Sequence, residues 1–145
     1  MCPVVYNNIY KGVLGEVIGR WVFEAILEIP LDDITEPEFF EKFDFKIRGV
    51  PAYVDFKHWK ETDPNKDAVM RKAIAEKARA CGAGYVIVAN VMTEDRYRIR
   101  SVSEDGVQII AIPSLLRYEN DVAHFDSDAL EKIGRIVDEW RSQNE

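Results

Sequence analysis

Two aspartates and one lysine, close together in the first half of the chain, have the types and spacing that metal-assisted chemistry needs. They lie in a stretch that reads as two short strands, about 43–48 and 51–58, joined by a two-residue turn. Side chains alternate between the two faces of a strand, so Asp55 and Lys57 share one face. The turn also sets the register, which places Asp44 directly opposite Asp55 with Cβ atoms about 5 Å apart.

Two carboxylates at this separation repel each other, and like charges directly opposite destabilise a hairpin. A proton or a cation between Asp44 and Asp55 would remove the repulsion. A hard divalent ion is the obvious candidate, and Lys57 would stand beside it. The alternative is that both aspartates are solvated residues at strand edges. Strands disfavour Asp, however, and apolar residues flank both positions, which favours the cation site.

Glu16 is a third acidic candidate, on a helix predicted over residues 9–28. Gly12, Gly15 and Gly19 cluster on one side of this helix with Glu16 at its edge, although each glycine costs about 1 kcal/mol relative to alanine. Glycines there would allow a backbone of protein or nucleic acid to approach closely. The alternative is a helix–sheet packing groove with an incidental surface glutamate. Together with the aspartate pair, Glu16 becomes a candidate ligand.

Hydrophobic periodicity predicts the elements that position these residues. The apolar face of the first helix is expected to consist of Val13, Leu14, Val17, Ile18, Trp21, Val22, Ala25 and Ile26. The later elements are a helical turn or loop over 35–42, a helix over 66–82, a strand buried on both faces over 85–91, exposed and apolar strands over 96–102 and 107–112, and a helix over 127–142 with Ser127 as N-cap. We therefore expect an α/β or α+β sandwich with a mixed central sheet flanked by helices.

The composition suits one compact domain over residues 1–145, with 47% hydrophobic residues. No apolar run approaches the roughly 20 residues of a membrane span, and the first residues do not read as a signal peptide. Cys2 and Cys81 do not make a disulfide framework, so a cytoplasmic protein is expected. The net charge of -7 argues against broad nonspecific nucleic-acid binding. It fits a domain that works beside a more basic neighbour in a larger protein.

A glutamate on the first helix, an aspartate on a strand and Asp-x-Lys on the next strand together resemble the PD-(D/E)XK nuclease superfamily. The stretch Lys-Gly-x-x-Gly-Glu, from Lys11 to Glu16, is similar to the first helix of the resolvase-like and Mrr-like branches. The resemblance covers residues 9–91. It implies a restriction endonuclease-like core in the order α-β-β-β-α-β, with residues 26–31 as the candidate first strand. Phe43 stands where the superfamily's name has proline.

The resemblance also implies a role for each motif residue. Asp44 and Asp55 would hold Mg²⁺ or Mn²⁺ with the backbone carbonyl of Phe56. Glu16 would be a further ligand, directly or through water. Lys57 would orient or help to deprotonate the attacking water and stabilise charge on the phosphate. The implied activity is that of a metal-dependent endonuclease that hydrolyses DNA phosphodiester bonds.

Two further sets of expectations concern partners. The candidates for contact with nucleic acid are Tyr10, Lys11, Lys60, Arg71 and Lys72. Each of the last three also reads as an exposed basic residue without such a role. The alternative function is a catalytically silent nuclease-fold module that docks a protein partner or nucleic acid, and a homodimer or a helicase or restriction partner fits either function.

Overall fold

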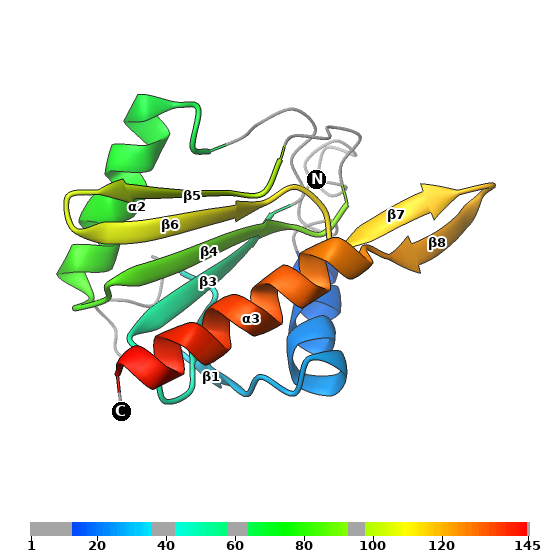
Figure 1. The fold of residues 1–145 in the computed structure, drawn as a ribbon, viewed down its shortest axis with the longest axis horizontal. Coiled ribbons are helices and arrows are strands. Elements are labelled where there is room, and N and C mark those ends of the chain that lie inside the picture. Colours follow the sequence, from blue (N-terminus) through cyan, green and yellow to red (C-terminus); the bar gives the residue numbers. More distant parts are fainter. Residues whose placement is uncertain (1–12, 36–42, 58–63, 93–97, 145) are drawn as a thin grey trace, which may run out of the picture.

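A six-stranded mixed sheet forms the centre of the molecule (Figure 1). The computed structural model describes residues 13–35, 43–57, 64–92 and 98–144. Its central strands are β1 (Leu31–Asp33), β2 (Phe45–Ile47), β3 (Ala52–Lys57), β4 (Tyr85–Asn90), β5 (Arg100–Glu104) and β6 (Val107–Ile112). Their order across the sheet is β1-β2-β3-β4-β6-β5. The N-terminal helix and α3 (Ser127–Gln143) pack on one face, and α2 (Ala68–Ala80) packs on the other.

The order of elements along the chain is the predicted one: a helix, three strands, α2 and then β4. Strands β1, β2 and β3 pair antiparallel, whereas β3 and β4 pair parallel because α2 carries the chain back to the same end of the sheet. The predicted mixed sandwich of α and β elements is therefore confirmed. The first strand, Leu31–Asp33, begins at the last residue of the stretch 26–31 that was expected to form it.

The β2–β3 hairpin has the predicted register. Lys46 lies opposite Tyr53 and Phe45 opposite Val54. The ladder ends at this pair, because Asp44 lies in a bend and donates its main-chain N–H to the carbonyl of Val54 at 3.2 Å. Gly49 adopts a φ of 80° in the turn, a conformation that glycine takes without steric cost. The strands themselves are shorter than predicted, because residues 43 and 44 are not part of β2.

Two hydrophobic cores lie on opposite faces of the sheet. One is built by the N-terminal helix, α3 and the strand residues between them, and Trp140 and Phe23 are its largest fully buried side chains. The other lies beneath α2, where Ala75 and Ala78 contact the sheet. Strand β4 is buried on both faces, as predicted, because it lies between the two cores.

The N-terminal helix presents its glycines to the sheet, which corrects the predicted inward face. This helix covers residues 13–21 and continues as the π-helix η1 (Val22–Ile26). Gly15 and Gly19 are buried, and the ring of Phe56 occupies the space beside Gly19 so closely that a Cβ there would lie 2.3 Å from Cδ1 of the ring. Of the apolar side chains that were expected to face inward, Val22 is buried and Ile18 packs against the core, as predicted. Five others are instead 36–60% exposed: Val13, Leu14, Val17, Trp21 and Ile26.

Other differences from the predicted elements are local. The N-cap of α3 is Asp126 rather than Ser127, because the Asp126 carboxylate accepts the main-chain N–H of Ala129 at 3.1 Å. Val69, on α2, is 80% exposed. A hairpin of β7 (Leu116–Glu119) and β8 (Val122–Phe125), which was not predicted, projects from the sheet (Figure 1).

The helical turn or loop predicted over 35–42 falls, except for its first residue, outside the described residues. The exposed strand predicted over 96–102 is β5, which begins at Arg100 and runs to Glu104. Within the described ranges, no helix is both long enough and apolar enough to cross a membrane.

Substitution of Gly19 tests the close packing of the N-terminal helix on the sheet. Gly19→Ala places a methyl group against the buried Phe56 ring, so we expect a loss of about 1–3 kcal/mol in the free energy of unfolding. The matched control is Gly134→Ala on α3, where nothing lies within 4 Å of an added Cβ, and where the helix should gain about 1 kcal/mol. Urea denaturation measures both, and equal stabilisation by the two substitutions would contradict the packing described.

Candidate active site

Asp44 and Asp55 are held by a reciprocal pair of hydrogen bonds at the end of the β2–β3 pairing. The main-chain N–H of Asp44 donates to Oδ1 of Asp55 at 2.9 Å. The main-chain N–H of Phe56 donates to Oδ2 of Asp44 at 2.8 Å. Each carboxylate therefore reaches across to the backbone of the other strand, which fixes the two acidic side chains close together.

A bend in the chain at Asp44 sends its two aromatic neighbours into opposite cores. Phe43 stacks on Tyr53 on the α2 side, with 5.1 Å between ring centroids. Phe45 packs near Phe56 on the other side, at 6.0 Å. Both phenylalanines are buried, so they anchor the backbone on either side of the aspartate and leave its carboxylate at the edge between the two cores.

Burial makes negative charge costly at both aspartates. It raises the pKa of Asp44 to about 6; a hydrogen bond with Glu16 and the Glu16 charge add to the rise, whereas the Phe56 N–H opposes it. Burial also raises the pKa of Asp55, and the Lys57 ammonium works against that rise. Lys57 Nζ lies 3.4 Å from Oδ2 of Asp55. The lysine thus offsets part of the charge that the pair carries.

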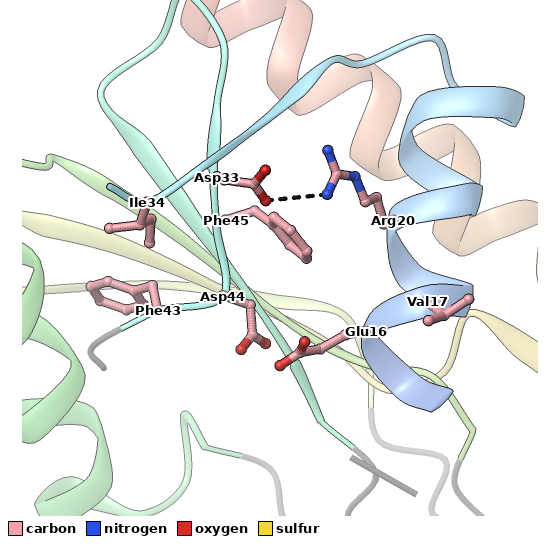
Figure 2. A pocket seen from close by; sticks show the side chains of 8 residues that line it. All are labelled: Glu16, Val17, Arg20, Asp33, Ile34, Phe43, Asp44 and Phe45. Carbon is pink, nitrogen blue, oxygen red and sulfur yellow. Dashed lines mark hydrogen bonds and ion pairs between the residues drawn. The ribbon is translucent and has the colours of Figure 1, made fainter. Parts of the chain in front are cut away.

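Glu16 reaches the same place from the N-terminal helix. Figure 2 shows its carboxylate directed toward that of Asp44, although the two residues come from different elements. Gly19 lies less than one turn further along the helix and allows the helix to approach Phe56. The structure therefore brings Glu16, Asp44, Asp55 and Lys57 to one end of the hairpin, and it is the close helix–sheet packing that carries Glu16 there.

The donor set fits a hard divalent cation in part. No group of three or more Asp, Glu, His or Cys side chains lies within metal-holding distance among the residues that the structure describes. Asp44 and Asp55 each use one oxygen for a main-chain N–H. The other oxygen of Asp55 faces Lys57, and Asp44 also has a hydrogen bond with Glu16, so a bound cation would replace or share these contacts. Mg²⁺ needs only one or two carboxylates because it keeps several waters. Burial raises the pKa of both groups, so the charged form of the pair is costly and a cation would stabilise it.

The predicted nucleic-acid contacts divide into two groups. Tyr10, Lys11 and Lys60 lie outside the described residues. Arg71 on α2 pairs with Glu104 at 3.2 Å and donates to the carbonyl of Asn65 at 2.8 Å. These contacts link α2 to the end of β5 and to the residues that precede the helix. Lys72 is exposed on the same helix. The role of the Phe56 carbonyl as a ligand stays a prediction.

A hollow of about 580 Å³ adjoins the carboxylates of Glu16 and Asp44. Two of its charged lining residues, Arg20 and Asp33, were not predicted as site residues. Its described lining is formed by Glu16, Val17, Arg20, Asp33, Ile34, Phe43, Asp44 and Phe45. Arg20 follows Glu16 by four residues, which places both on one helix face, and that spacing was the available signal. Asp33 had no such signal, because a three-residue strand has too short a pattern to recognise.

No protein-family model matches the chain, and no curated protein matches it either. The function is therefore inferred from the site itself.

The pH dependence of stability tests the burial of the Asp44 charge. An acid whose pKa is raised to about 6 in the folded protein binds its proton more tightly there than in the unfolded chain. Stability should consequently fall as the pH rises from about 4 to about 6 and stay reduced above that range. Asp44→Asn removes this loss, so in chelator the variant should exceed the wild type at pH 8 by about 1–2 kcal/mol, after allowance for solvent that reaches the site.

Urea denaturation at pH 4, 6 and 8 measures the difference, which should vanish toward pH 4. The control is Asp138→Asn on α3, whose side chain is 80% exposed and should leave the pH profile unchanged. An Asp44→Asn variant that is less stable than the wild type at pH 8 would show that the charge is not held at an energetic cost.

Proposed function

We propose that this chain is a metal-dependent deoxyribonuclease domain of the PD-(D/E)XK type, with Glu16, Asp44, Asp55 and Lys57 as its site. The observation that carries the proposal is the pair of reciprocal hydrogen bonds that holds Asp44 and Asp55 together, with Lys57 at 3.4 Å from Asp55. The order of elements, which is that of the core implied by the resemblance, supports it further.

Hydrolysis of a phosphodiester requires an oriented water and stabilisation of the charge that develops on the phosphate. The carboxylates of Asp44 and Asp55 would hold Mg²⁺ or Mn²⁺, with Glu16 as a further ligand directly or through water. When bound, such an ion would lower the pKa of a coordinated water and neutralise phosphate charge. The reciprocal hydrogen bonds fix the positions of both carboxylates before a metal ion binds.

Lys57 supplies the positive charge of the protein itself. Its side chain is partly exposed and its ammonium is held beside Asp55, where it would orient the attacking water or stabilise a phosphate oxygen. Because burial raises the pKa of Asp44 to about 6, its proton must leave before the carboxylate can hold a cation. Activity should therefore rise with pH through the range near 6.

The alternative is a catalytically silent nuclease-fold module that docks a protein or nucleic acid. The net charge of -7 favours it, since it disfavours unaided binding to DNA. A catalytic domain delivered by a basic partner, such as a helicase or restriction subunit, accounts for the same charge. A homodimer and a cytoplasmic location likewise stay predictions.

Cleavage of plasmid and of labelled single-stranded DNA tests the proposal. We expect cutting with Mg²⁺ or Mn²⁺, none in EDTA, and a rate at least about 100-fold lower for Lys57→Ala, because a charge positioned at the reacting phosphate is lost. The control is Lys132→Ala, which removes an exposed lysine on α3 and should retain the wild-type rate. Absence of cutting under every metal condition would favour the silent module.

A further inference from the structure

The hollow beside the carboxylates has an apolar side and a polar end. Ile34, Phe43 and Phe45 line the apolar side, and Arg20 and Asp33 lie at the end away from the Glu16–Asp44 pair (Figure 2). Its volume of about 580 Å³ falls within the roughly 300–1,000 Å³ typical of ligand pockets. The hollow is continuous with the candidate active site, because Glu16 and Asp44 line both.

Arg20 is fixed in position at the polar end. Its Nε lies 2.6 Å from Oε1 of Glu24, and its Nη1 lies 3.2 Å from Oδ1 of Asp33. The guanidinium also lies over the ring of Phe45, 5.0 Å from the centroid. The side chain nevertheless remains 39% exposed. The Phe45 ring covers one face of this planar cation, and the opposite face is the one that can stack on a planar ligand.

The charges of the lining select against an anion. Glu16, Asp33 and Asp44 contribute three carboxylates, whereas Arg20 contributes the one positive charge among the described lining residues. Away from the cation proposed at Asp44 and Asp55, a phosphate group in this hollow would be repelled. A neutral planar group with hydrogen-bond donors suits it better, because the Asp33 carboxylate can accept from an exocyclic amine and the guanidinium can stack against a ring.

We propose that this hollow receives an unpaired nucleobase next to the scissile phosphate, so that the substrate is single-stranded at the site of cutting. The inference rests on the proposed nuclease function. In a duplex the base edges are paired and stacked, and a base reaches a side pocket only after unpairing at a cost of a few kcal/mol. A single strand, a flap or a frayed end meets no such cost. Cytosine and adenine, which carry exocyclic amines, suit Asp33 best.

The first test compares one labelled strand alone with the same strand annealed to its complement. The single strand should be cut at least about 10-fold faster. Abasic substitutions, introduced one position at a time, should lower the rate by about 10-fold at a single position beside the cut, since stacking of one base contributes substantially to binding. Equal rates on both substrates, with no sensitive position, would overturn the inference and leave the nuclease function standing.

A matched pair of variants locates the effect. Arg20→Lys keeps the charge and loses the planar surface. This variant should therefore cut the intact strand and the strand that is abasic at the sensitive position at the same rate. Arg48→Lys is the control, because Arg48 pairs with Asp32 on the neighbouring edge and does not line the hollow. If the abasic site lowers the cutting rate of Arg20→Lys and of Arg48→Lys by the same factor, the base does not bind beside Arg20.

Binding without cutting separates this inference from the proposed function. A single strand that carries 2-aminopurine at the sensitive position, bound to the Lys57→Ala variant in Mg²⁺, should gain fluorescence as the base leaves the stack of its neighbours, and adding Arg20→Lys should abolish the gain. If the wild type cuts no DNA, the same probe can be scanned along the strand. A fluorescence gain that depends on Arg20 would then support the base site although the nuclease proposal had failed, and absence of a gain would overturn the base site as well.

Discussion

Two hydrogen bonds across the hairpin are the constraint on which the site depends. Each joins a main-chain N–H on one side of the hairpin to an aspartate carboxylate on the other. They hold Asp44 and Asp55 together although burial raises the pKa of both. The arrangement exists only in the register set by the turn at Gly49. A slip of one residue would move Asp55 to the other face of the sheet, away from Asp44.

Phe56 connects this constraint to the rest of the fold. Its main-chain N–H holds Asp44, while its ring lies against Gly19 and makes an edge-to-face contact with Phe23 at 5.4 Å. One residue therefore joins the acidic pair to the helix that carries Glu16. Because the ring leaves no room for a Cβ at Gly19, the distance between helix and sheet and the position of the third carboxylate depend on the same contact.

The hairpin and its acidic pair were predictable because their signals are local. Alternation along the strands and a glycine at the turn were enough to bring Asp44 close to Asp55, although the strand pairing itself ends at Phe45 and Val54. The inward face of the first helix was only partly predictable from its apolar periodicity. Val22 is buried as expected, but Gly15 and Gly19 are also buried, whereas Val13 and Val17 are exposed. The hollow was missed because Asp33 and Arg20 meet only through tertiary packing.

The central claim is that Asp44 and Asp55 form a cation site, and anomalous diffraction from a crystal soaked in Mn²⁺ tests it most directly. A peak with oxygens of both aspartates at about 2.1 Å, the distance of a hard divalent ion from carboxylate ligands, would support the account. A fully occupied peak elsewhere, with the two carboxylates still bound only to main-chain N–H groups and Lys57, would contradict it.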